Sequence, residues 1–278
     1  MTVRTAGLSR STEHSSRRTV FRPAFSGGFV NFGHWRGIPL DRDLSLTDRI
    51  DSHRSLYRLA LRAMDMTESG RLLDIGCGRG HGTALAMREF MPEEARGVDT
   101  HAKRIERARV DNAGTVRHFE GRLTYEVGSA SSLPYPDQHF DWVVSIQAIQ
   151  EIADLHEFAV ETARVMGGGG HVAIASFFSA TPDRWNEDLP DLAMLLTDGL
   201  CYAHPVATLE AQLAANGFTG IKVASIGEYV WPGLDTWLAH TDLDPHLARI
   251  WLRAYQRGIL DYYVVTATAS TASEGWRE

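Results

Sequence analysis

Apolar positions follow two alternating patterns through most of the chain. Short continuous apolar runs predict buried strands, and apolar residues spaced three and four apart predict amphipathic helices. The predicted strands are 71–75, 95–99, 123–127, 140–146, 171–178, 221–229 and 262–267, and the predicted helices are 45–66, 81–90, 102–110, 154–166 and 206–216. Strands that alternate with helices predict an α/β fold in which helices cover both faces of a parallel sheet.

Five segments lie outside this alternation. Residues 1–26 and 269–278 are polar and without periodicity, so we expect disordered tails, the first of them basic. Residues 27–66 begin with aromatic residues interleaved with glycines and continue into a helix, which predicts a lid. Residues 179–205 and 230–257 are rich in aromatic residues, and we expect helices there that cap a binding site. The chain between the tails shows no linker, so we expect one domain.

Composition and charge exclude several classes of protein. With 28 Lys and Arg against 35 Asp and Glu, the net charge is −7, which is unfavourable for binding a nucleic-acid backbone. No run approaches the roughly 18 apolar residues of a membrane span, and the start lacks the apolar stretch of a signal peptide. An Arg- and Ser-rich start could mimic an organelle transit peptide, but we expect a plain tail. Two cysteines fit a reducing compartment, so we expect a cytoplasmic protein.

A glycine-rich loop between the first predicted strand and the next helix carries the strongest signal. Its glycines allow tight turns and let a ligand lie directly on the backbone, and the helix N-terminus beyond offers free N–H groups. Asp99 ends the second predicted strand, where a carboxylate can accept both hydroxyls of a ribose. The dinucleotide fingerprint does not fit, because its third glycine would fall at His81 or Thr83.

The run D-I-G-C-G-R-G at 74–80, followed by G-V-D at 97–99, resembles the cofactor signature of class I S-adenosylmethionine-dependent methyltransferases of the small-molecule, natural-product type. The resemblance continues through 128–137 and 163–170 and covers about residues 29–268. It implies S-adenosyl-L-methionine as cofactor, with S-adenosyl-L-homocysteine as product. It also implies a Rossmann-like, seven-stranded, mostly parallel sheet with an antiparallel last strand, helices on both faces and a helical lid. Residues 27–268 would then form a single methyltransferase domain.

The same resemblance implies a set of cofactor contacts. Asp74 would lie beneath the amino group and Asp99 would hold the ribose, while the loop glycines pack against the cofactor. Ser129, with Ala130, would flank the adenine, although the family often has Asp at the serine position. Residues 31–35 resemble an N-terminal element that folds over the cofactor. The expected cofactor-binding residues are Asp74, Gly76, Cys77, Gly78, Gly80, Asp99, Thr100, Ser129, Ala130, Gln147 and Trp35.

The position where many related O-methyltransferases carry E-x-x-H reads Gln147-Ala-Ile-Gln150. Methyl transfer from a sulfonium needs proximity and alignment, and a poorly ionised nucleophile such as an alcohol also needs a general base. An amide orients a substrate but takes no proton at neutral pH. We therefore expect Gln147 and Gln150 to orient the substrate. His34 in the lid and His53 on the first helix remain the alternative bases.

Aromatic residues gather in the segments that should cover the site. Such side chains line pockets for small molecules, although plain core packing will account for at least half of them. No Arg or Lys cluster accompanies them, so the substrate should be flat, neutral and apolar rather than phosphorylated. The predicted pocket residues are Phe32, Trp35, Phe177, Phe178, Trp185, Tyr229, Trp231 and Trp237.

We therefore expect an enzyme of secondary metabolism that methylates a small, neutral, aromatic or indole-like natural product at carbon or nitrogen. One alternative is an O-methyltransferase of a sugar or polyketide hydroxyl that uses a histidine base. Another is a non-catalytic, cofactor-binding partner subunit. No His, Cys, Asp or Glu set has metal-site spacing, so we expect no metal. Nucleic-acid and membrane partners are not expected, and a homodimer is left open.

Overall fold

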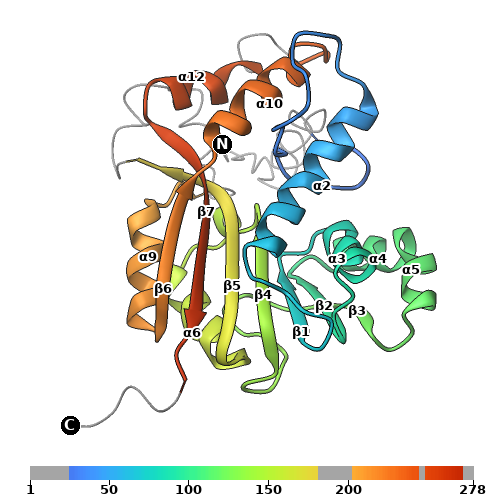
Figure 1. The fold of residues 1–278 in the computed structure, drawn as a ribbon, viewed down its shortest axis with the longest axis vertical. Coiled ribbons are helices and arrows are strands. Elements are labelled where there is room, and N and C mark those ends of the chain that lie inside the picture. Colours follow the sequence, from blue (N-terminus) through green and yellow to red (C-terminus); the bar gives the residue numbers. More distant parts are fainter. Residues whose placement is uncertain (1–24, 181–201, 244–247, 272–278) are drawn as a thin grey trace, which may run out of the picture.

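The computed structural model describes residues 25–180, 202–243 and 248–271. A seven-stranded sheet runs through these residues in the order β3-β2-β1-β4-β5-β7-β6, with helices on both faces (Figure 1). This architecture confirms the Rossmann-like α/β prediction. The tails 1–24 and 272–278 and the segment 181–201, where an inserted helical lobe was expected, lie outside the described residues.

Six strands run in the same direction, and the last strand in the sequence runs against both of its neighbours, as expected. The strands are β1 (Arg71–Ile75), β2 (Glu94–Asp99), β3 (Leu123–Val127), β4 (Phe140–Ile146), β5 (Met166–Ser179), β6 (Phe218–Ser225) and β7 (Leu260–Ala269). β5 begins at Met166 because the four glycines that follow are part of the strand. β6 ends at Ser225, and the predicted remainder of that strand forms the short 3-10 helix η3 (Gly227–Tyr229).

Alternate residues of each strand pack into two separate hydrophobic cores, one on each face of the sheet. Leu72 of β1 packs in the first core with helices α2 and α3, whereas the adjacent Leu73 packs in the second core with α6 and α9. The first face carries α2 (Leu46–Arg62), α3 (His81–Glu89), α4 (Ala102–Asp111) and α5 (Ala113–His118), and the second carries α6 (Leu155–Val165) and α9 (Val206–Ala215). Two buried faces explain why the parallel strands appear as continuous apolar runs.

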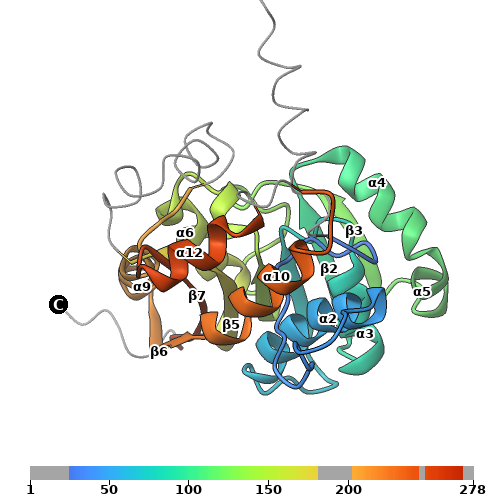
Figure 2. The same ribbon diagram turned by 90° about the horizontal axis from the view of Figure 1, so that it is seen from above.

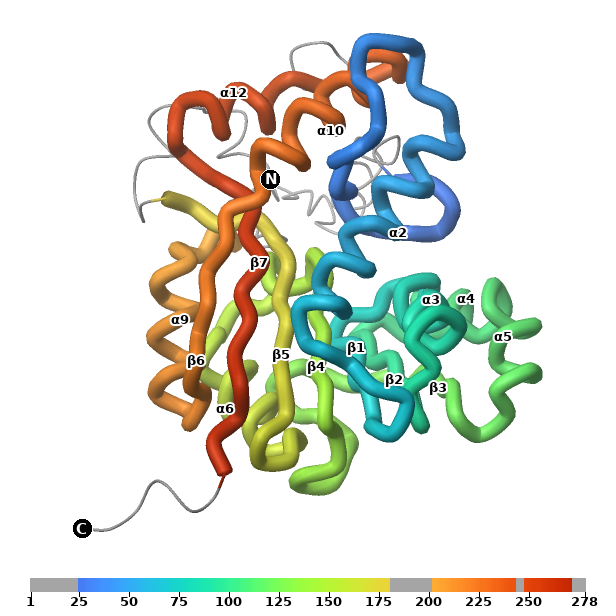
Figure 3. The backbone as a smooth tube through the Cα atoms, in the orientation of Figure 1, coloured from blue at the N-terminus to red at the C-terminus, as the bar shows by residue number. Residues whose placement is uncertain are grey.

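The carboxyl ends of the parallel strands lie beneath a cover built from both ends of the described chain. The N-terminal segment and α2 meet α10 (Trp231–Leu238) and α12 (Ile250–Gln256) above the sheet (Figures 1 and 2). The tube in Figure 3 follows the same path from blue to red. Helix α2 starts with a capping box, in which Ser45 and Asp48 each accept a backbone N–H from the other. No described helix combines the length and apolar character that crossing a membrane requires.

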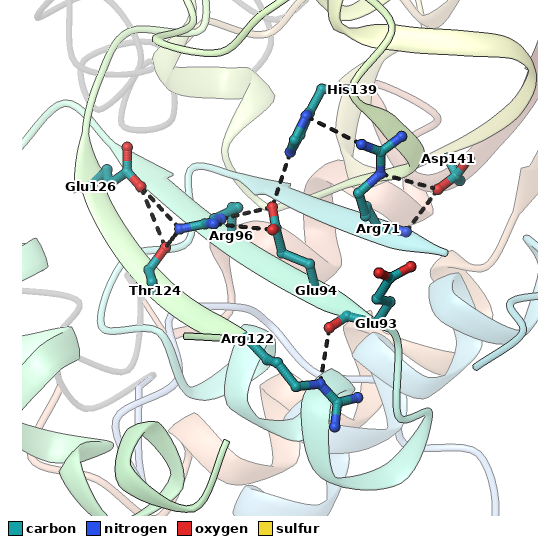
Figure 4. Close-up of polar contacts among 9 residues, drawn as sticks. All are labelled: Arg71, Glu93, Glu94, Arg96, Arg122, Thr124, Glu126, His139 and Asp141. Atoms are coloured by element: carbon teal, nitrogen blue, oxygen red, sulfur yellow. Dashed lines mark hydrogen bonds and ion pairs between the residues drawn. The ribbon is translucent and has the colours of Figure 1, made fainter. Parts of the chain in front are cut away.

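Charged side chains meet at the opposite, amino edge of the parallel strands (Figure 4). Glu94 at the start of β2 accepts from Arg96 at 2.7 Å and lies 3.1 Å from Nε2 of His139. Nδ1 of His139 in turn lies 3.3 Å from the Arg71 guanidinium, and the Arg71 backbone N–H donates to Asp141 at 2.8 Å. We call Arg71, Glu94, Arg96, His139 and Asp141 the amino-end network.

Candidate active site

The glycine-rich loop joins β1 to α3 at the carboxyl edge of the sheet. Gly76 has φ +77°, and a Cβ there would lie 2.2 Å from the Ala148 Cβ, so both backbone and packing require glycine. Gly78 has φ +56°, and a Cβ there would meet nothing within 4 Å. The loop therefore presents an open backbone face at Gly78. The Gly76 N–H donates to the Val98 carbonyl at 2.8 Å, which ties the loop to β2.

Two pockets adjoin this loop, and both are lined by Val30, Gly76 and Gly78. Pocket A has a volume of about 610 Å³, open solvent included, and pocket B about 260 Å³. The other residues of pocket A are Ile75, Val98, Asp99, Thr100, Arg104, Gly128, Ala130, Gln147, Ala148, Glu151 and Ile152. The other residues of pocket B are Gly28, Phe29, Tyr57, Cys77, Arg79, His81, Gly82 and Ile146. Because they share the loop, the two pockets form one elongated site.

Asp99 is a buried carboxylate in the wall of pocket A. Its Oδ2 accepts the Gly78 N–H at 3.1 Å, and its Oδ1 accepts the His101 N–H at 2.8 Å. The Arg104 guanidinium lies 3.2 Å from Oδ2. These contacts fix the plane of the carboxylate, which is the requirement for binding a pair of hydroxyls.

Asp74 lies fully buried beneath the loop. Its Oδ2 accepts the Thr83 hydroxyl at 2.7 Å, whereas its Oδ1 has no hydrogen-bond partner among the described residues. Burial raises the pKa of Asp74 to about 7, against the opposing effect of the Thr83 hydrogen bond. A buried acceptor without a partner is unfavourable by about 1–3 kcal/mol, so a cationic or hydrogen-donating ligand group at this position would stabilise the site.

Gln147 follows β4 with the unusual φ of +51° and lines pocket A. Its Oε1 accepts the Phe32 backbone N–H at 2.9 Å and the Tyr262 hydroxyl at 3.0 Å. Within the described part of the chain, its Nε2 donates to no group. The side-chain oxygen therefore fastens the N-terminal segment to the sheet, and the NH₂ group remains for a ligand. A non-glycine residue in the left-handed region is strained, and such strain is typical of functional sites.

Gln150 lies in η2 (Ile149–Glu151) and is engaged at both ends of its amide. Its Nε2 donates to the Gln147 carbonyl at 2.5 Å, and its Oε1 accepts the Ser176 hydroxyl at 2.7 Å. It lines neither pocket A nor pocket B. The structure therefore places Gln150 as a brace for the turn that carries Gln147. Its predicted contact with the substrate stays a prediction.

His53 and His34 do not join Gln147 at the pockets. Nε2 of the buried His53 accepts the Ser26 N–H at 3.4 Å, so its Nδ1, 2.9 Å from Asn31 Oδ1, carries the proton. Burial, assisted by Arg49, lowers the pKa of His53 well below 6.5. Burial and then Arg36 lower the pKa of His34, whose ring meets the Tyr229 ring edge-on at 5.5 Å. Both imidazoles therefore pack the lid in their neutral form.

The segment 31–35 is anchored by Arg49 and by η3. The fully buried Arg49 donates to the Phe32 carbonyl at 2.8 Å and the Asn31 carbonyl at 3.1 Å, and burial lowers its pKa to about 9. The centroid of the Trp35 ring lies 5.1 Å from the Arg49 guanidinium, and the backbone N–H of Trp35 donates to the Tyr229 carbonyl at 2.7 Å. Trp35 is thus buried inside the lid and lines neither pocket A nor pocket B.

An aromatic cluster lies next to Gln147. The Trp231 and Trp251 rings stack at 5.8 Å, and Phe32 and Phe177 approach Trp251 at 5.1 and 5.2 Å. Tyr262, which donates to Gln147, meets Trp231 edge-on at 5.7 Å. We call Phe32, Phe177, Trp231, Trp251 and Tyr262 the aromatic cluster. It brings together three of the predicted pocket residues.

The remaining predicted pocket residues lie elsewhere. Phe178 faces the second core and meets Tyr263 at 6.1 Å, because neighbouring residues of a strand point to opposite faces. This corrects the expectation that Phe178 and Phe177 share a pocket. Tyr229 packs on His34 from η3, and Trp237 lies half-buried on α10. Trp185 lies outside the described residues.

Most of the predicted cofactor residues gather at pockets A and B, and four do not. Asp74 lies buried beneath the loop and lines neither pocket. A Cβ at Gly80, which precedes α3, would lie 2.4 Å from the Tyr125 ring, so Gly80 packs on Tyr125. Ser129 bonds to Ser131 at 2.9 Å and, like Trp35, lines neither pocket. The residues at pocket A that sequence reasoning missed include Val30, Arg104 and Glu151. Nowhere in the described ranges do three His, Cys, Asp or Glu side chains gather to hold a metal ion.

Comparisons with known proteins agree with this geometry. Residues 73–174 match the family model of a methyltransferase domain. The chain is 30% identical over 171 residues to a fatty-acid O-methyltransferase of Mycolicibacterium smegmatis, covering 61% of this chain and 58% of that protein. It is 31% identical over 139 residues to the ajmaline N-methyltransferase of Rauvolfia serpentina, covering 47% of each. The matches thus span less than two thirds of these relatives.

Among solved structures, the fold is similar to that of a geranyl diphosphate C-methyltransferase from Streptomyces coelicolor A3(2). The TM-score is 0.76 at 16% sequence identity, and the match covers 95% of this chain and 99% of that one. That structure contains S-adenosyl-L-homocysteine. At this identity the likeness establishes the fold alone.

Proposed function

Because the chain belongs by domain and fold to the class I S-adenosylmethionine-dependent methyltransferases, we propose that it transfers a methyl group from S-adenosyl-L-methionine to a small molecule. The observation that carries the proposal is the pair of pockets along the glycine loop, with Asp99 in the wall of pocket A and Asp74 buried beneath the loop. The unpartnered Oδ1 of Asp74 fits an ammonium group. The oriented Asp99 carboxylate fits ribose hydroxyls, and Gly78 leaves room for the ligand.

The bound cofactor supplies a methyl group on a sulfonium, which needs no further activation. The chain's own contribution is alignment of the acceptor and exclusion of water. Gln147 contributes to both tasks, because its oxygen holds the lid at Phe32 and its NH₂ group is left for a ligand in pocket A. Arg49 and His53 hold the same lid segment at Asn31 from the side of α2.

The acceptor that this site fits best is a neutral, aromatic or indole-like molecule methylated at carbon or nitrogen. The support is the aromatic cluster that packs beside Gln147, although its rings are buried in the first core and line neither pocket A nor pocket B. Both nitrogens of His53 are occupied within the lid, so that residue offers no free base. An electron-rich ring carbon attacks first and loses its proton afterwards, so the methyl transfer itself needs no base.

The alternative is O-methylation of a hydroxyl, and the similarity to a fatty-acid O-methyltransferase favours it as the second candidate. Turnover against indoles, phenols, amines and hydroxy acids, with the methylated atom located by NMR, decides between the two. A shallow dependence of kcat on pH that survives His34→Gln and His53→Gln supports carbon or nitrogen. A steep acid limb that either substitution removes, together with the activity, supports oxygen. No turnover of any acceptor by the isolated chain supports a non-catalytic partner subunit.

A further inference from the structure

Arg104, in the first turn of α4, connects residues on two sides of pocket A. Its Nη1 lies 3.2 Å from Asp99 Oδ2 and 3.2 Å from Glu151 Oε2. Its Nη2 lies 3.2 Å from Glu151 Oε1. Asp99 ends β2 and Glu151 lies in η2 after β4, and all three residues line the pocket. A single guanidinium thus connects the two carboxylates across the site.

The acceptor positions of Asp99 are nearly filled in this arrangement. Each oxygen of a carboxylate accepts about two hydrogen bonds. Oδ2 receives the Gly78 N–H and the Arg104 guanidinium, and Oδ1 receives the His101 N–H and lies 3.3 Å from the His101 ring Nδ1. The two backbone donors are fixed by the main chain, so only the positions of the Arg104 guanidinium and the His101 ring can be exchanged. Two ribose hydroxyls need two acceptor positions on this carboxylate. One of them is therefore the position that Arg104 occupies.

We propose that Arg104 and a ribose hydroxyl of the cofactor compete for Asp99, and that Glu151 takes over the guanidinium when the ribose binds. The proposal rests on the proposed function. The exposed fractions of the side chains fit these roles, at 2% for Asp99, 28% for Arg104 and 33% for Glu151. Asp99 is fixed, whereas the other two have room to move. The exchange keeps the buried carboxylate partnered both with and without the cofactor, which avoids an uncompensated buried charge.

Two substitutions at this contact shift cofactor affinity in opposite directions. Arg104→Met removes the competitor, so S-adenosyl-L-homocysteine binds about fivefold more tightly by calorimetry, the size expected for a half-exposed ion pair. Glu151→Gln leaves the guanidinium on Asp99, so the same ligand binds about fivefold more weakly. The matched controls are Arg107→Met, on the exposed side of α4, and Glu157→Gln, on the exposed side of α6. They make the same charge changes away from pocket A. They leave the affinity unchanged.

A double substitution and a second ligand isolate the mechanism. Because Glu151 acts only through Arg104, the double variant binds as tightly as Arg104→Met alone. With an S-adenosyl-L-homocysteine analogue that lacks both ribose hydroxyls, the gain in Arg104→Met disappears. A gain that persists with this analogue reflects the overall charge of the pocket and overturns the proposal.

The outcomes also separate this inference from the function on which it rests. If the unaltered chain binds S-adenosyl-L-homocysteine but both single variants move in the same direction or not at all, the competition is wrong and the proposed function stands. If the unaltered, folded chain binds neither S-adenosyl-L-methionine nor S-adenosyl-L-homocysteine, both fail.

Discussion

Strand β2 begins at Glu94 and ends at Asp99, and these two carboxylates belong to very different regions. Glu94 lies in the amino-end network, where Arg96 and His139 surround it (Figure 4). Asp99 lies at pocket A, close to the glycine loop and to Asp74, which keeps one oxygen without a partner. The amino edge of the sheet carries charges that satisfy one another, and the carboxyl edge carries polar groups that are left incomplete.

The charged groups at the amino edge stabilise the fold, whereas the groups at the carboxyl edge are suited to binding a ligand. Arg96 and then His139 hold the pKa of Glu94 below its usual value, which means that the fold favours the ionised form. At the carboxyl edge, burial instead raises the pKa of Asp74 to about 7, which means that the fold disfavours its charge. A site that binds a cationic or hydroxyl-bearing ligand needs such incomplete groups. Their burial at the carboxyl edge supports the proposal that this edge binds the cofactor.

Substitution of the carboxylates at the two ends of β2 tests this comparison most directly. We expect Asp99→Ala to reduce the affinity for S-adenosyl-L-homocysteine by about 1.5–3 kcal/mol, through lost hydrogen bonds to a charged group. The matched Glu94→Ala, on the same strand, should leave that affinity unchanged. Calorimetry measures both. Equal effects of the two substitutions would show that the edges do not differ in function.

The residues at the ends of β4 give the next largest contrast. Gln147→Ala removes the acceptor of Phe32 and Tyr262, so we expect kcat/KM to fall by the equivalent of about 1–3 kcal/mol through a loosened lid. Tyr262→Phe keeps the Phe32 contact and should lose about 0.5–1.5 kcal/mol. His139→Ala, just before β4, is the control and should retain kcat/KM. Full activity of Gln147→Ala would exclude the anchoring role.

Asp74 should make cofactor binding depend on pH. An ammonium group above Asp74 favours the ionised carboxylate, so binding releases a proton from a group whose pKa is about 7. Affinity should therefore fall as the pH falls below 7, by up to about tenfold per unit. Asp74→Asn should bind more weakly at pH 8 and show no such slope. A slope that survives Asp74→Asn would assign the proton to another group.

The smallest expected effect is on the stability of the amino-end network. Because the pKa of Glu94 is lowered in the fold, its contribution to stability is present above the ordinary glutamate pKa of 4.5 and is lost as the pH falls through the pKa of the folded state. We expect Glu94→Gln to lower the free energy of unfolding by about 0.5–1 kcal/mol at pH 7. Urea unfolding at pH 7 and pH 3 checks this, and a difference that persists at pH 3 would contradict it.

Features with a local physical cause could be predicted from the sequence. The glycine loop and Asp99 were identified because tight backbone turns and strand ends have residue-level requirements. The alternation of β1 and α3 could be predicted because the spacing of apolar residues along the chain is also a local property. The predicted start of β5 at residue 171 is too late because Met166 already pairs with Phe140, and glycines 167–170, which lie in the register shift before His171, carry no side-chain pattern.

Contacts between distant residues could not be predicted. Arg104 and Glu151 are 47 positions apart, and Gln150 and Ser176 are 26 apart. His53 looked like a candidate base by type and position, but Asn31 and Ser26 occupy its two nitrogens. The fold decides whether such a polar group faces a ligand or another residue, and the sequence shows only that the group exists.

The hydrogen bonds of Gln147 also impose an order of assembly. Gln147 Oε1 meets Phe32, 115 residues before it, and Tyr262, 115 residues after it. The lid segment is synthesised well before β7, which carries Tyr262 and completes the aromatic cluster against the lid. Contacts so distant in the chain form slowly. The full set of contacts at Gln147 therefore forms only after β7 has been synthesised, and a nascent chain that ends before β7 lacks the Tyr262 hydroxyl that donates to Gln147.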